Sequence, residues 1–71
     1  MPDIDIRKKF STNYSSQQVE VLNRALDYAT KMHEGQKRES GEPYITHPIA
    51  VANILIDLGL DYSAVSAALL H

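Results

Sequence analysis

The sequence lacks several features, and each absence excludes a class of protein. It has no cysteine, so no disulfide can stabilise its 71 residues, which is compatible with a cytoplasmic location. No run of about 18 apolar residues occurs, so we expect no membrane span and no membrane partner. The net charge is −2 and no expected helix has a basic face, which argues against direct binding to nucleic acid.

What remains has the composition of one small globular domain. Hydrophobic residues make up 44% of the chain and charged residues 23%, values that suit a soluble folded segment rather than a disordered tail. A chain this short buries only roughly 60% of the surface that it exposes when unfolded. We therefore expect a single, marginal hydrophobic core.

The first firm element is a helix over residues 16–34. Ser15 and Gln18 have the spacing of a capping box, in which each residue satisfies a free backbone N–H at a helix start. Gly35 is a natural C-terminal stop. The side chains that share one helical face are Leu22, Ala25, Leu26, Ala29, Met32 and His33.

Two further helices are expected, which gives an all-α fold with three main helices. One begins at His47-Pro48, since proline suits the first turn of a helix, and ends at Gly59. Its expected buried stripe consists of Ile49, Ala52, Leu55, Ile56 and Leu58. Asp61 can cap the last helix, which begins at Tyr62. For residues 1–14, a short helix and an extended arm are both compatible with the pattern.

The last helix is apolar on almost every side, and such a helix has to be buried. Its apolar residues are Ala64, Val65, Ala67, Ala68, Leu69 and Leu70. The sequence offers nothing after His71 to cover them. We therefore expect residues 1–71 to be the N-terminal portion of one domain, truncated at its C-terminal end, and to self-associate through residues 61–71.

Three histidines are candidates for chemistry. Each also has an ordinary structural explanation: His33 can interact with the carbonyls at the end of its helix, and His47 can cap or pack at a helix start. His71 follows a buried helix, where an imidazole needs a partner and a metal is one choice. Their spacings match no short-range zinc pattern, so spacing alone does not decide between these roles.

The only long loop, residues 35–46, holds a short run of charged and polar side chains. Such a run is usually a solvated surface, but Lys37, Arg38 and Ser40 could also contact phosphate. The planar guanidinium of arginine has donors that match phosphate oxygens, and Gly41 would let the backbone approach closely. Both interpretations stay open on composition alone.

Several motifs taken together resemble the hydrolase domain of the Rel/Spo family, whose members make and degrade (p)ppGpp, the alarmone of the bacterial stringent response. The resemblance runs from about Ala25 to the last residue. It rests on His-x-Gly-Gln at 33–36, Arg38, Ser-Gly-Glu-Pro-Tyr-Ile at 40–45, His47-Pro48 and Ala-Ala-Leu-Leu-His at 67–71. The family has an all-helical fold of the His-Asp (HD) superfamily.

The resemblance implies roles for particular residues. His47 would be the first metal ligand and His71 the histidine of the His-Asp pair, with Mn²⁺ as the usual metal and two aspartates completing the set. Lys37, Arg38 and Ser40 would lie in the nucleotide-contacting loop. Relatives often have lysine where this chain has Glu39, which argues against a phosphate contact at that position. For His33 we expect a role in ordering the loop.

The resemblance also implies an activity. The family's 3′-pyrophosphohydrolase converts (p)ppGpp to GDP or GTP and pyrophosphate, often in a protein that is also a (p)ppGpp synthetase. We expect residues 1–71 alone to be inactive, because the aspartates lie beyond them. Two alternatives remain: another HD-type nucleotide phosphohydrolase, and a helical protein-interaction module that binds a partner through the apolar last helix.

Overall fold

The computed structural model describes residues 2–71, with side chains from residue 3, and the named elements of regular secondary structure in that range are all helices. The helices are α1 (Pro2–Asn13), α2 (Ser16–Met32), α3 (Thr46–Asp57) and α4 (Tyr62–Leu70). The prediction of an all-α fold is confirmed. Helix α1 resolves the open choice for residues 1–14 in favour of a helix, apart from Met1, which lies outside the described residues.

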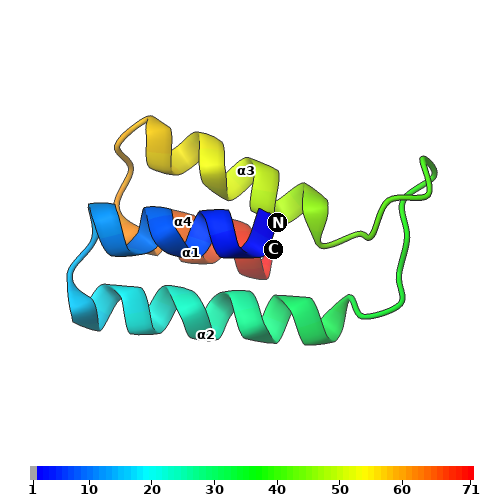
Figure 1. Cartoon of the computed structure of the whole chain (residues 1–71), viewed down its shortest axis with the longest axis horizontal. Coiled ribbons are helices and arrows are strands. Elements are labelled where there is room, and N and C mark those ends of the chain that lie inside the picture. Colours follow the sequence, from blue (N-terminus) through cyan, green and yellow to red (C-terminus); the bar gives the residue numbers. More distant parts are fainter. Residues whose placement is uncertain (1) are drawn as a thin grey trace.

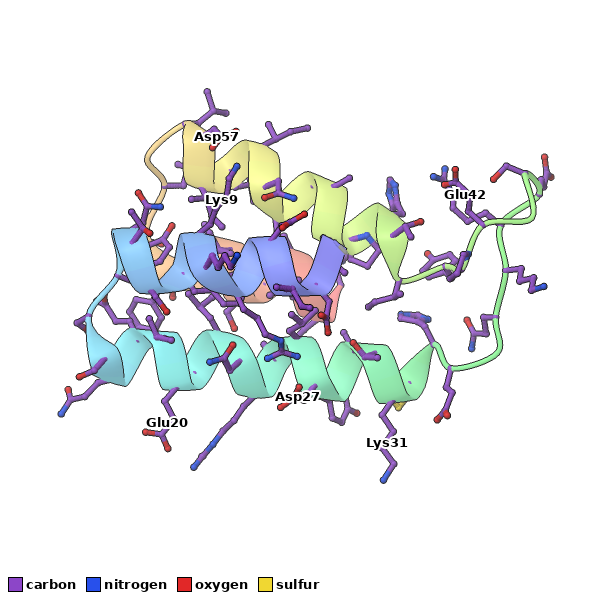
Figure 2. The ribbon with its side chains drawn as sticks, viewed as in Figure 1. Lys9, Glu20, Asp27, Lys31, Glu42 and Asp57 are labelled. Carbon is purple, nitrogen blue, oxygen red and sulfur yellow. The ribbon has the colours of Figure 1, made fainter. Side chains whose placement is uncertain are left out.

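Tertiary contacts explain why the polar N-terminal segment is helical. Ile6 and Phe10, one turn apart, are fully buried in the core. On the flanks of the helix, Arg7 donates to Asp27 of α2 at 2.6 Å and Lys9 donates to Asp57 of α3 at 2.8 Å. Figure 2 shows Lys9 and Asp57 pointing toward each other. Packing against two neighbours, more than intrinsic propensity, therefore stabilises α1.

Helix α2 begins as the sequence predicts, since both hydrogen bonds of the Ser15–Gln18 capping box are present. Its end differs from the expected position 34: the helix stops at Met32, with His33 as the C-cap. Met32 is 56% exposed rather than buried. Figure 1 shows that the last turn of α2 extends past the ends of α1 and α4, so neither of these helices covers the Met32 side chain.

Helix α3 starts one residue before the predicted position and places Pro48 in its first turn. Its buried side chains include Ile49, Ala52 and Ile56. The prediction that Leu58 joins this stripe is wrong, because Leu58 is the C-cap and is 71% exposed. The chain turns away there through Gly59, whose φ of 79° favours glycine.

Helix α4 is capped by the Asp61 side chain, which accepts a hydrogen bond from the Ala64 backbone N–H at 2.9 Å. Val65 and Leu69 are buried, because α4 packs against both α2 and α3. The expectation that these side chains need residues after His71 to cover them is therefore wrong for Val65 and Leu69. Leu70, at 51% exposure, is the large apolar side chain that remains accessible on α4.

The four helices form a bundle in which α1 and α4 lie on opposite sides, each in contact with both α2 and α3 (Figure 1). The core is one cluster to which every helix contributes. The end of α2, the segment joining it to α3, the start of α3 and the end of α4 all lie at one end of the bundle. This end carries the candidate site. None of the described helices is long and apolar enough to cross a membrane.

Candidate functional site

The segment between α2 and α3 is a small hairpin rather than an irregular loop. The Arg38 N–H donates to the Glu42 carbonyl and the Gly41 N–H to the Arg38 carbonyl, both at 2.8 Å. Nearer the bundle, the Tyr44 N–H donates to the Gln36 carbonyl at 2.9 Å. Residues 36–44, called the hairpin below, extend beyond the helices, and Figure 2 labels Glu42 on this projecting part.

His47 and His71 lie on the same hollow, although twenty-four positions separate them in the sequence. His47 is the second residue of α3, and His71 directly follows α4. Both line a cavity of about 620 Å³, called the two-histidine hollow below, whose other lining residues are Tyr44, Pro48, Val51, Ala67 and Ala68. Within residues 2–71 neither imidazole makes a hydrogen bond, and both are exposed. Two nitrogen donors are thus available to a ligand there.

The three expected nucleotide-contacting residues also come together. Lys37, Arg38 and Ser40 line a second cavity of about 790 Å³, called the hairpin hollow below, with Glu39, Glu42 and Tyr44. Arg38 additionally lines a third cavity, of about 410 Å³, together with His47. Arg38 and the first predicted metal ligand, His47, therefore border the same cavity.

Comparison with known proteins decides the family. Residues 25–71 match the HD domain family. The chain belongs to the HD domain family. The matched range begins inside α2 and includes the hairpin and both candidate metal ligands, so the site described above lies wholly within the HD domain region.

The HD domain chain is also similar to curated Rel/Spo proteins, which confirms the Rel/Spo resemblance. It is 46% identical over 70 residues to a probable GTP pyrophosphokinase of Mycobacterium leprae, covering 99% of the chain and 8% of that protein. It is 52% identical over 58 residues to the bifunctional (p)ppGpp synthase/hydrolase RelA of Mycobacterium tuberculosis, covering 82% of the chain and 8% of RelA. It is 48% identical over 66 residues to the bifunctional (p)ppGpp synthase/hydrolase SpoT of Escherichia coli, covering 93% of the chain and 9% of SpoT.

The HD domain hairpin carries equal numbers of positive and negative side chains around its hollow. Two cations, Lys37 and Arg38, share its hollow with two carboxylates, Glu39 and Glu42. Among the described residues neither cation forms an ion pair with a carboxylate. Both positive charges are therefore accessible to an anion, which would not have to displace an existing partner.

The two-histidine hollow supplies only part of a metal site. In the part of the chain that the structure describes, no group of three or more His, Cys, Asp or Glu side chains lies close enough to hold a metal ion. Two neutral imidazoles suit several transition metals, but hard ions such as manganese also require oxygen donors. The donor chemistry thus fits half of a mixed imidazole and carboxylate site.

Neither Tyr44 nor Tyr14 was assigned a role from the sequence. Tyr44 lines both the two-histidine hollow and the hairpin hollow, and its position three residues before His47 is the signal that could have identified it. His33 packs on its ring, with centroids 4.4 Å apart. His33 therefore contacts the loop that we expect it to order, and the ordering role itself stays a prediction.

Tyr14 has a structural role at the opposite end of the bundle. Its hydroxyl donates to the Leu60 carbonyl at 2.8 Å, which joins the two interhelical connections there. Burial raises the pKa of Tyr14, and the nearby Asp61 carboxylate adds to the effect. Because the neutral phenol is the form that donates this hydrogen bond, the bond persists at neutral pH.

Proposed function

We propose that this HD domain region forms part of a metal-dependent 3′-pyrophosphohydrolase that acts on (p)ppGpp. The observation that carries the proposal is the meeting of His47 and His71 on one hollow, beside the hairpin that bears Arg38. The names of the relatives supply the substrate. The parent protein, by the same comparison, would be bifunctional with a synthetase, and a nucleotide substrate favours a cytoplasmic location.

His47 and His71 are the residues that would hold the metal, for which Mn²⁺ is the proposed ion. When bound, such an ion polarises a phosphoryl oxygen and lowers the pKa of a water molecule. Both imidazoles are accessible and free of hydrogen bonds within residues 2–71, so neither has to break a contact to bind. The carboxylate ligands would have to come from outside the described residues.

Lys37, Arg38 and Ser40 would bind the nucleotide in this proposal. Arg38 offers several N–H donors in one plane, which can form paired hydrogen bonds with phosphate oxygens. Lys37 adds a second positive charge and Ser40 a hydroxyl. Since Arg38 lines a cavity with His47, a phosphate bound by the guanidinium would lie near the proposed metal.

A segment exchange tests this proposal. Residues 6–71 replace the matching segment of E. coli SpoT, and release of pyrophosphate from (p)ppGpp is measured with Mn²⁺. The exchanged protein should retain activity, and His47→Ala or His71→Ala should abolish it. Lys37→Ala and Arg38→Ala should raise KM, whereas Lys8→Ala, which removes an exposed cation of α1, should not. Full activity of either histidine variant would contradict the proposal.

The isolated 71-residue chain should release no pyrophosphate under the same conditions. Two imidazoles without carboxylates hold Mn²⁺ weakly, and the metal is needed to generate the attacking water. Turnover by the pure chain, at a rate that scales with its concentration, would show that residues 1–71 carry a complete site.

An apolar surface favours a second candidate, a helical interaction module that self-associates. A cavity of about 410 Å³ between α2 and α4 is lined by Val21, Arg24, Ala25, Tyr28, Ser66 and Leu70. Val21, Tyr28 and Leu70 are each more than 40% exposed. Within residues 61–71, Leu70 would make this contact, because Val65 and Leu69 are buried. Leu70→Lys should abolish association measured by light scattering, and a monomeric wild-type chain at high concentration would reject this candidate.

A further inference from the structure

Tyr44 is the residue through which the hairpin and the two-histidine hollow meet. It lines both the two-histidine hollow and the hairpin hollow and remains 37% exposed. Its backbone N–H forms the hydrogen bond that closes the base of the hairpin, to the Gln36 carbonyl. Any displacement of Tyr44 would therefore change how Lys37 and Arg38 lie relative to His47.

His33, the C-cap of α2, fixes this residue from the side of the bundle. The His33 and Tyr44 rings pack with centroids 4.4 Å apart and a tilt of 35°. The same imidazole also contacts Gln36, with its Nδ1 3.0 Å from Oε1. One side chain thus contacts both residues that form the base of the hairpin.

The hydrogen bonds define the orientation of these groups. Gln36 Nε2 donates to the Met32 carbonyl at 3.3 Å, so the amide oxygen of Gln36 faces His33. An amide oxygen only accepts, so His33 Nδ1 must carry a hydrogen. Reversing the Gln36 amide would place two acceptor oxygens against each other. The contact therefore has one favourable arrangement, which suits a rigid support.

The hairpin needs such a support because it lies outside the bundle. Figure 1 shows it extending beyond the ends of the helices. Its backbone hydrogen bonds to the flanking residues His33, Thr46 and His47 are made by residues at its base, whereas those of Arg38 and Gly41 run within residues 36–44. A small rotation at the base becomes a larger displacement at Lys37 and Arg38. A misplacement of about 1 Å can cost a large factor in rate when substrate groups must be aligned.

We infer that His33 is a positioning residue, which acts through Tyr44 and Gln36 to set the distance between the hairpin cations and the two-histidine hollow. This inference rests on the proposed function for its effect on catalysis. The contact between His33 and the hairpin does not depend on that function. Two experiments therefore test the structural role of His33 and its effect on catalysis separately.

The first experiment uses the isolated chain and measures amide hydrogen exchange by NMR. In His33→Ala, the Tyr44 and Arg38 amides of the hairpin should exchange on the order of tenfold faster, because an aromatic pair and a hydrogen bond are lost. His33→Phe keeps a ring against Tyr44 and should recover part of the protection. Met32→Ala is the matched control, since Met32 accepts from Gln36 through its backbone carbonyl, which the substitution retains. Unchanged hairpin amides in a folded His33→Ala chain would overturn the inference.

The second experiment uses the exchanged SpoT protein. His33→Ala should raise KM for (p)ppGpp about tenfold, a change expected from losing one aromatic pair and one hydrogen bond, with a smaller effect on kcat. If His33 acts through Tyr44 and Gln36, adding His33→Ala to the double variant Tyr44→Ala/Gln36→Ala should cause no further loss. Additive effects, or a loss in kcat alone, would overturn the inference. An inactive wild-type exchange would instead reject the proposed function and leave the amide measurement to decide the role of His33.

Discussion

Replacing Phe10 with alanine tests whether α1 is part of the core. Phe10 is fully buried, and it packs in the same cluster as Ile6, Leu22 and Leu26. Removing a buried phenylalanine side chain costs about 3–5 kcal/mol, because transfer free energy is lost and a cavity remains. A domain of 71 residues has a total stability of about 4–11 kcal/mol, taking about 0.05–0.15 kcal/mol per residue. The substitution should therefore remove a large part of the free energy of unfolding.

Urea denaturation followed by circular dichroism measures this loss. Ile4→Ala is the matched control, because Ile4 lies on the same helix but is 50% exposed, and surface substitutions usually change stability by about 0.5 kcal/mol or less. If Phe10→Ala leaves too little folded protein to measure, Phe10→Leu should still show a loss of about 1 kcal/mol. Equal losses in the free energy of unfolding for Phe10→Ala and Ile4→Ala would refute the packing of α1 in the core.

Three smaller effects follow from the same structure. Burial favours the neutral phenol of Tyr14 and raises its pKa in the folded chain. Its contribution to the free energy of unfolding is therefore complete below the ordinary pKa of 10.0 and is lost as pH rises through the raised pKa. In Tyr14→Phe, the free energy of unfolding should fall less steeply with pH in this alkaline range. Ser15→Ala removes the capping box and should cost about 1 kcal/mol in thermal unfolding. Lys9→Ala breaks the exposed pair with Asp57 and should cost at most about 1 kcal/mol, less at high salt.

The Ser15 and Lys9 effects each have a control at a neighbouring position. Ser16→Ala changes a neighbouring hydroxyl that does not cap α2, so it should leave the melting temperature almost unchanged. Lys8→Ala removes an equivalent charge that forms no ion pair among the described residues. A salt-independent loss for Lys9→Ala, or an alkaline profile of Tyr14→Phe that matches the wild type, would contradict the corresponding contact.

Local patterns predicted the helix N-termini that carry a specific chemical signal. Ser15 with Gln18 marked the start of α2, and Asp61 marked the start of α4, because a side-chain oxygen three residues before a free N–H is a local arrangement. The C-terminal ends of α2 and α3 were predicted less accurately. Met32 and Leu58 followed the apolar periodicity but are exposed, since the neighbouring helices do not reach them.

The sequence by itself determined the helical class, the two caps and, through the motifs of residues 33–47 and 67–71, the family. It also named His47 and His71, but from their spacing alone each was as well explained by packing. Only the tertiary structure decided that both imidazoles line one hollow, because the bundle brings the start of α3 and the end of α4 to the same end. It also decided that α1 is a helix and that α4 is covered, since burial depends on residues distant in the sequence.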